Sequence, residues 1–137
     1  MMADQASAEL HKTFGPGPHW VIADGTDEFV GTLRLAPIDV ANRSARLGIG
    51  ILDPTRLGQG LGTAATLLAL DYGFGSLGLH RIGLTVLANN ARAIAAYQNC
   101  GFVVEGRLRD TLFRNGGWHD DLAMAVLAPD WATRLTA

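Results

Sequence analysis

The sequence predicts an α+β domain in which helices flank a mixed, mostly antiparallel sheet. Three observations lead to this fold class. Short segments of alternating apolar residues are separated by turn-forming residues, which is typical of strands. A glycine-rich loop stands between a strand and a helix in the middle of the chain, and Asn115-Gly116-Gly117 marks a hairpin near its end. Strands and helices mixed in this way indicate one layered domain.

The first half of the chain predicts one helix and three strands. The helix covers residues 3–12 and is ended by Gly15-Pro16-Gly17-Pro18. The strands cover residues 20–23, 29–35 and 45–52. Pro37 and the polar Asn42-Arg43-Ser44 place a connection before the last of these strands.

The second half predicts two helices and three strands. The elements are a helix over 63–76, a strand over 81–87, a helix from Asn89 or Asn90 to Cys100, and strands over 103–113 and 122–127. Asparagine is a favoured N-cap, and Gly101 stands where a glycine C-cap belongs. The order indicates one mixed sheet with helices packed on it.

Length and composition exclude several classes of protein. The 137 residues fit a single domain, and 48% apolar against 18% charged residues favour a filled core over disorder. The net charge is −2 and the basic residues are dispersed, which argues against binding to nucleic acid. Cys100 is the one cysteine, so an internal disulfide is excluded. Without a membrane span or signal-peptide pattern, we expect a soluble cytoplasmic protein.

The glycine-rich loop Gly58-Gln59-Gly60-Leu61-Gly62 is the first candidate site. Helix N-termini carry unpaired N–H groups and a partial positive charge, which suit a phosphate or pyrophosphate. The loop lacks the lysine of a P-loop and the glycine spacing of a dinucleotide fingerprint. In the preceding strand, Gly48 and Gly50 leave backbone bare on one face, along which a linear ligand could lie. A tight turn and close packing of a helix are the structural alternatives.

Four motifs together resemble the GCN5-related N-acetyltransferase (GNAT) superfamily. They are Gly58-Gln59-Gly60-Leu61-Gly62, then Asn90-Ala91-Arg92-Ala93-Ile94-Ala95-Ala96-Tyr97 with Gly101-Phe102, then Glu105-Gly106-Arg107-Leu108-Arg109-Asp110, and Gly117-Trp118-His119-Asp120-Asp121-Leu122-Ala123-Met124. The last two resemble the RimJ/RimL-type branch, which includes acetylases of ribosomal-protein amino termini and is close to spermidine acetyltransferases. The resemblance covers residues 20–128 and implies the GNAT fold, with helices on both sides of the sheet.

The resemblance implies an acetyl-CoA site over residues 45–102. The strand over 45–52 would pair with the pantetheine arm, the loop and helix start would receive the pyrophosphate, and an asparagine would touch the arm or the opposite lip. The implied contacts are Gly50, Ile51, Leu52, Leu57, Gly58, Gln59, Gly60, Leu61, Gly62, Thr63 and Asn90. The strands over 45–52 and 81–87 would splay apart around the thioester. A backbone N–H near Ile51 or Leu52 would stabilise the oxyanion.

Tyr97 is the candidate catalytic residue. It follows Asn90 by seven residues, so both project toward one side of the helix. In the family a tyrosine here protonates the departing CoA thiolate, and a phenol can donate that proton. The structural alternative is a core aromatic that holds the helix to the sheet.

Two positions depart from the family pattern. Leu57 stands where many relatives carry arginine or glutamine, and Arg56 offers charge nearby. Arg46 stands where relatives often carry the glutamate that deprotonates the acceptor amine, so the base is unassigned. The possible replacements, each otherwise a solvated or structural charge, are Glu105, Asp110, Asp120 and Asp121. An amine of low pKa or a water relay would need no dedicated base.

The resemblance implies transfer of acetyl from acetyl-CoA to a primary amine by direct attack in a ternary complex, without a metal. The acceptor could be a peptide amino terminus, a polyamine or a small amine. The alternatives are a non-catalytic CoA-binding module and a nucleotide-binding protein. His80 and His119 lack metal-ligand partners at useful spacing, and Cys100 lacks a base, so all three read as structural.

The segment before the first predicted hairpin is short for this family. Residues 1–19 would be a truncated N-terminal segment, with the first strand and helix shortened or missing. Such a chain would expose a sheet edge, and an exposed edge invites pairing with a second chain. We therefore expect a homodimer that completes the acceptor side of the site.

Overall fold

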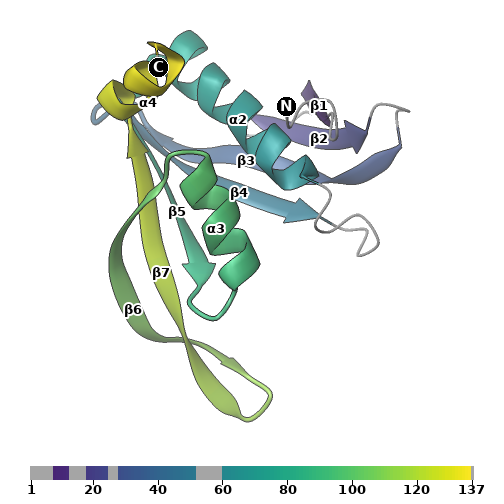
Figure 1. The fold of residues 1–137 in the computed structure, drawn as a ribbon, viewed down its shortest axis with the longest axis vertical. Helices are drawn as coiled ribbons and strands as arrows, with labels where there is room; N and C mark the ends of the chain where they lie inside the picture. The colour runs from purple at the N-terminus through teal and green to yellow at the C-terminus, as the bar shows by residue number, and fades with distance from the viewer. Residues whose placement is uncertain (1–7, 13–17, 25–27, 52–59, 137) are drawn as a thin grey trace.

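The computed structural model describes the chain except residues 1–7, 13–17, 25–27, 52–59 and 137. Its centre is a seven-stranded sheet in the order β1-β2-β3-β4-β5-β7-β6 (Figure 1). The strands are β1 (Ala8–Lys12), β2 (His19–Asp24), β3 (Phe29–Asp39), β4 (Ser44–Ile51), β5 (Arg81–Leu87), β6 (Val103–Arg114) and β7 (Gly117–Leu127). The helices are α2 (Leu61–Asp71), α3 (Ala91–Asn99) and α4 (Ala128–Thr136), and η2 (Tyr72–Ser76) is a π-helical turn.

The sheet is mixed and mostly antiparallel, as predicted. β4 and β5 form its parallel pair, and the remaining neighbours run antiparallel. A parallel pair needs a crossover connection, and here the chain between β4 and β5 includes α2 and η2. The strand predicted over 81–87 has the observed bounds of β5, in which buried apolar residues alternate strictly with more exposed positions.

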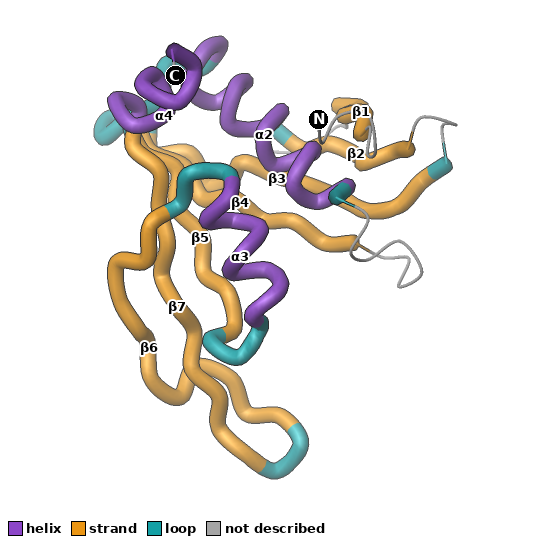
Figure 2. Tube along the Cα trace, in the orientation of Figure 1, coloured by secondary structure: helices purple, strands orange, loops and turns teal. Residues whose placement is uncertain are grey.

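The described helices pack on one face of the sheet, where the family resemblance predicts helices on both (Figures 1 and 2). Leu33, Leu47 and Ile82 of the sheet share one core cluster with Leu61 and Trp131 of the helices. The opposite sheet face presents more polar and smaller residues, among them the exposed Thr32, Arg34, Arg46 and Thr85. Within the described part of the chain, no helix covers this face.

The helix predicted over residues 3–12 is wrong for the described residues 8–12. They form β1, which pairs antiparallel with β2 in a register that sets Leu10 opposite Ile22. A helix of this length is marginal on its own, whereas the edge of β2 offers a row of backbone hydrogen-bonding partners. The first strand, expected to be shortened or missing, is thus present with five residues.

Two strands differ in extent from the prediction, and one helix was not predicted. β3 continues through Pro37 to Asp39, and the register shifts between Leu35 and Ile38, where a proline is tolerated because the ladder is interrupted. β7 begins at Gly117, five residues earlier than predicted. α4 was not predicted, although Pro129 fits the first turn of a helix, where its missing N–H has no partner to lose.

Candidate active site

β4 and β5 separate after three paired positions. The parallel register joins Ser44 to Arg81, Ala45 to Ile82 and Arg46 to Gly83, and goes no further. β3 nevertheless pairs with β4 as far as Ile51, and β7 pairs with β5 as far as Leu87. Each strand therefore keeps its outer neighbour while its inner edge lacks a strand partner among the described residues. The splay expected between these strands is confirmed, and it leaves backbone groups of β4 available to a ligand.

The start of α2 lies beside β4. Gly62 is close enough that a Cβ on it would lie 4.0 Å from the Ile49 side chain of β4. The N-cap is Gly60, whose φ of 80° is a conformation that glycine adopts without strain. Among the residues that the structure describes, no side chain caps this helix, and its first turn holds no acidic residue. The N–H groups of Leu61, Gly62 and Thr63 thus keep the positive end of the helix open to an anion.

Four of the residues expected to bind the cofactor, Leu52, Leu57, Gly58 and Gln59, lie outside the described residues. Gly50 and Ile51 lie on β4 beyond the last position that pairs with β5. Gly60, Leu61, Gly62 and Thr63 lie at the start of α2. The structure therefore brings the two described groups to the same end of the β4–α2 unit.

The predicted cap of α3 is confirmed. Asn90 is the N-cap, and its side-chain oxygen accepts a hydrogen bond of 3.2 Å from the N–H of Ala93. At the other end Gly101 has a φ of 104°, as a glycine C-cap requires. The oxygen of Asn90 is thus already used within the helix, so its amide nitrogen is the group left for an outside ligand.

Tyr97 lies on the face of α3 that packs against the core. Its side chain is half-buried, and its ring meets that of Phe102 edge to face at 5.6 Å. Burial, with a smaller contribution from the neighbouring Cys100, raises the pKa of Tyr97 to about 12. The phenol keeps its proton at neutral pH, as an ordinary tyrosine does, while the raised pKa makes it a weaker acid. The case for Tyr97 as a proton donor therefore depends on its position and not on its pKa.

Cys100 joins α3 to α2. Its buried thiol donates a hydrogen bond of 3.8 Å to the carbonyl oxygen of Thr63, and burial raises the pKa of this thiol to about 11. A thiol of such high pKa is a poor nucleophile, which agrees with the structural role expected for Cys100. The N–H of Cys100 also donates to the carbonyl oxygen of Tyr97, which closes the end of α3.

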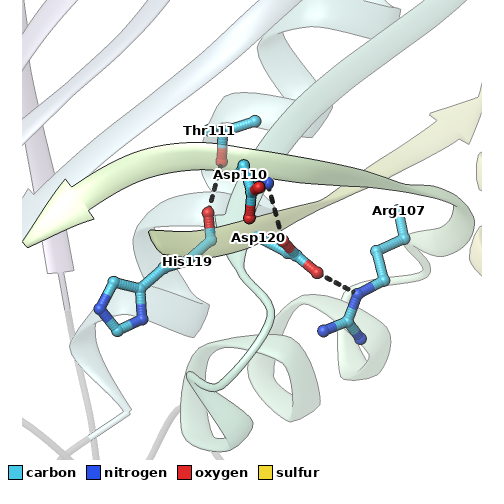
Figure 3. A network of polar contacts seen from close by, with 5 residues as sticks. All are labelled: Arg107, Asp110, Thr111, His119 and Asp120. Carbon is cyan, nitrogen blue, oxygen red and sulfur yellow. Dashed lines mark hydrogen bonds and ion pairs between the residues drawn. The ribbon is translucent and has the colours of Figure 1, made fainter. Parts of the chain in front are cut away.

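Two of the four candidate bases are held in ion pairs. Glu105 accepts two hydrogen bonds from Arg81, of 2.6 and 2.8 Å, and this bonding lowers the pKa of Glu105. Asp120 accepts from the N–H of Asp110 at 2.8 Å and from Arg107 at 2.6 Å, and both bonds lower the pKa of Asp120 (Figure 3). A carboxylate of lowered pKa is a weaker proton acceptor, so neither suits the role of general base.

Asp110 belongs to the same network, which fixes an irregularity in β6. The β6–β7 register shifts between Leu108 and Leu112, and Asp110 has a φ of 53°. Asp120 takes the backbone N–H of Asp110, while Thr111 donates to the carbonyl oxygen of His119 at 3.3 Å (Figure 3). These contacts give Asp110 and His119 structural positions.

Arg46 marks the point where β4 and β5 part. It occupies the last paired position of β4, and its guanidinium lies 3.4 Å from the hydroxyl of Thr85, the second residue of β5 beyond the pairing. Neither Thr85 nor the nearby Arg34 belongs to a sequence motif, so sequence reasoning did not identify them. Among the described residues, no cluster of three or more His, Cys, Asp or Glu residues could hold a metal ion. The same part of the chain contains no helix long and apolar enough to span a membrane.

Comparison with protein families identifies this architecture. Residues 2–103 match the model of the acetyltransferase (GNAT) domain. The chain therefore belongs to the GNAT acetyltransferase family, and its fold is the GNAT fold that the four motifs predicted.

Curated relatives include several N-acetyltransferases. The chain is 36% identical over 115 residues to the spermidine N(1)-acetyltransferase of Vibrio cholerae, covering 84% of this chain and 66% of that protein. It is 38% identical over 99 residues to the enzyme of the same name from Escherichia coli, covering 72% and 53%. A putative ribosomal N-acetyltransferase, YdaF of Bacillus subtilis, is 33% identical over 101 residues, covering 74% and 55%. The chain thus spans about half to two thirds of the length of these relatives.

A solved structure shows the same fold. The dodecameric spermidine N-acetyltransferase of Vibrio cholerae superposes with a TM-score of 0.81 at 34% identity, covering 88% of this chain and 70% of that one.

Proposed function

We propose that this protein transfers an acetyl group from acetyl-CoA to a primary amine, in a ternary complex in which the amine attacks the thioester directly. The acceptor is a peptide amino terminus, a polyamine or a small amine. The observation that carries the proposal is the separation of β4 and β5 after Arg46 and Gly83, with the uncapped start of α2 beside β4 and Tyr97 on the following helix α3. The proposal treats the chain as one domain with residues 45–102 as its cofactor-binding core.

The cofactor would lie on the helix-covered face and reach the gap from there. The inner edge of β4 at Gly50 and Ile51 offers N–H and C=O groups to the two amides of the pantetheine arm. The first turn of α2 offers uncapped N–H groups and the helix dipole to the pyrophosphate. An N–H at the end of β4 would stabilise the oxyanion of the tetrahedral intermediate. Leu52, Leu57, Gly58 and Gln59 are part of the same proposal, and Asn90 would contact the arm through its amide nitrogen.

Tyr97 would protonate the CoA thiolate as it leaves. The half-buried phenol is protonated at neutral pH, since burial raises its pKa further above the ordinary value for tyrosine. Once the C–S bond breaks, the O–H proton passes to sulfur, and the phenolate recovers a proton from solvent. Its contact with Phe102 fixes the ring, so the hydroxyl needs no reorganisation during the reaction.

Asp121 is the candidate base that best fits the geometry. It pairs with Leu87 at the end of β5, and alternation along β7 places its side chain with Ala123 on the uncovered face. In the described part of the chain Asp121 takes no part in a side-chain hydrogen bond or ion pair of the kind that holds Glu105 and Asp120. We propose that Asp121, directly or through water, accepts the proton of the attacking amine.

Release of CoA thiol in the presence of acetyl-CoA and a panel of primary amines tests the proposal. We expect amine-dependent thiol release that Tyr97→Phe lowers, while calorimetric titration shows unchanged binding of acetyl-CoA. Binding of acetyl-CoA without thiol release for any amine would instead support a non-catalytic CoA-binding module. Stabilisation of the fold by a nucleotide but not by CoA would contradict both the acetyl transfer and the CoA-binding module.

We further propose that the protein forms a homodimer in the cytoplasm. β1 and β6 are the edges of the sheet, and β6 is a twelve-residue strand that is exposed along most of its length. Such edges favour strand pairing with a second chain. The free thiol of Cys100 fits a reducing compartment. Sedimentation equilibrium tests the dimer, and a monomer at all concentrations would contradict it.

A further inference from the structure

The uncovered face of the sheet carries three arginines near the separation of β4 and β5. Arg34 lies on β3, Arg46 on β4 and Arg81 on β5. Arg81 is neutralised by its ion pair with Glu105. Arg34 and Arg46 have no carboxylate partner within the described residues, so two positive charges are left uncompensated on this face.

Arg46 points toward the reaction gap. Its neighbour across the parallel pair is Gly83, whose lack of a side chain leaves room on this face. The guanidinium passes Gly83 and reaches the hydroxyl of Thr85, two residues further along β5. The charge therefore lies where the strands part, on the side from which an acceptor would approach a cofactor bound under the helices.

Arg34 lies diagonally opposite Arg46. It pairs with Gly48, two residues along β4 from Arg46, and diagonal neighbours of this kind lie about 7–8 Å apart. The Arg34 side chain lies across the bare backbone of Gly48, since a Cβ there would come within 2.8 Å of its Nε. The spacing refers to the backbone positions, and both long side chains extend from them over the same face, Arg34 across Gly48 and Arg46 toward Thr85. A carboxylate between them can accept hydrogen bonds from both guanidinium groups.

Among the described residues, no acid on this side of the molecule forms an ion pair with Arg34 or Arg46. A pocket of about 230 Å³ next to Arg46 is also lined by Asp39 and Ser44. The Asp39 carboxylate stays ionised, and its 2.7 and 3.0 Å hydrogen bonds from Asn42 orient it within its own loop. Asp121 lies on the other side of Thr85, opposite Leu87. A ligand can thus meet a cationic group at Arg34 and Arg46 and a proton acceptor at Asp121.

We propose that Arg34 and Arg46 form an anion subsite that selects acceptor amines carrying a carboxylate a few bonds from the reacting nitrogen. The proposal rests on the acetyl transfer proposed above and narrows its acceptor class. The guanidinium groups bind the carboxylate and hold the amine at the gap, while a second ammonium group on the acceptor is repelled by the same charges. Arg46 therefore does not take over the role of a base, and determines specificity instead.

Three primary amines of similar length test the proposal: 4-aminobutanoate, butylamine and 1,4-diaminobutane. They differ at the far end in being anionic, neutral and cationic. Thiol release should give the highest kcat/KM for 4-aminobutanoate, about tenfold or more above butylamine, and the lowest for the diamine. A preference for the diamine, or equal values for all three, would overturn the subsite.

Variants assign the preference to the two arginines. Arg34→Gln and Arg46→Gln should each lower kcat/KM for 4-aminobutanoate about tenfold to hundredfold and leave butylamine within about twofold. Arg46→Lys should recover part of the preference, because it keeps the charge and loses the planar fork. Arg114→Gln, an equal loss of charge at the far end of β6, should change none of the three values. An unchanged preference in the Arg34 and Arg46 variants contradicts the assignment.

A binding measurement separates this proposal from the proposed reaction. Calorimetric titration of the CoA-saturated protein with 4-acetamidobutanoate should show binding that Arg46→Gln weakens at least about tenfold, with N-butylacetamide as the neutral control. Such binding without thiol release for any amine would support the subsite and reject the reaction. Turnover of butylamine without arginine-dependent binding of 4-acetamidobutanoate would reject the subsite and keep the reaction.

Discussion

The thiol of Cys100 donates a hydrogen bond to the carbonyl oxygen of Thr63 and joins the end of α3 to the first turn of α2. The two helices that border the proposed cofactor site are thus held together at one buried point. The N–H of the same Cys100 donates to the carbonyl oxygen of Tyr97, so the residue that anchors α3 to α2 also closes the last turn of the helix that carries Tyr97.

The burial of Cys100 predicts slow modification of its thiol. At pH 7 a disulfide reagent should react with the native protein at least about a hundredfold more slowly than with the denatured chain, because the thiol must be exposed and ionised first. Saturating acetyl-CoA should slow the reaction further by stabilising the folded state. Rapid, stoichiometric labelling of the native protein would contradict the buried position.

The two raised pKa values predict a loss of stability at alkaline pH. Burial raises the pKa of Cys100 from 9.0 to about 11 and that of Tyr97 from 10.0 to about 12, so the folded state binds protons more tightly than the unfolded chain. Their contribution is complete below pH 9 and is lost as the pH rises toward 11 and 12. Each shift corresponds to on the order of 2 kcal/mol. Urea unfolding between pH 8 and 11 measures it, and Cys100→Ala should flatten the pH dependence.

Tyr97→Phe should separate chemistry from binding. Removing the hydroxyl should lower kcat by about a hundredfold, as for loss of a general acid. The dissociation constant for acetyl-CoA should stay the same because the ring still packs on Phe102. Tyr72→Phe is the matched control, since Tyr72 lies on η2, outside the site, and its ring packs on Trp20 of β2. Equal loss of activity in both variants would show a general effect on the fold.

Asp121→Asn tests the base. We expect kcat/KM to fall about tenfold or more at neutral pH, and to recover partly at higher pH as more of the free amine is already deprotonated. Asp130→Asn, which removes an exposed carboxylate in the first turn of α4, should leave the pH profile unchanged. An unaltered pH profile of kcat/KM for Asp121→Asn would show that solvent, and not Asp121, deprotonates the attacking amine.

Gly62→Ala tests backbone binding of the pyrophosphate. The added methyl would lie 4.0 Å from the Ile49 side chain, an ordinary contact, so the fold should tolerate it and gain about 0.5–1 kcal/mol from replacing a helical glycine. It would nevertheless reduce the space at the first-turn N–H groups, and we expect binding of acetyl-CoA to weaken about tenfold. Gly75→Ala, on η2 with no atoms near its added methyl, is the control. Unchanged affinity in Gly62→Ala would place the phosphates elsewhere.

Local sequence patterns predicted elements whose stability is local. β5 follows its alternation, α3 follows its asparagine N-cap and glycine C-cap, and the β6–β7 turn follows Asn115 and Gly116. The helix predicted for residues 8–12 was wrong because pairing with β2 outweighs a weak helical pattern. Such pairing depends on residues distant in sequence, and a window of local sequence does not contain it.

The sequence by itself determined the family and the order of the central elements, because these depend on short motifs and periodic apolar residues. The tertiary structure decided what surrounds the reaction gap. It holds Glu105 and Asp120 in ion pairs, places Asp121 of β7 opposite the last residue of β5, and sets Arg34 of β3 diagonally across from Arg46 of β4. These relations arise from strand register and from the separation of β4 and β5, which set residues far apart in the chain side by side on one uncovered face.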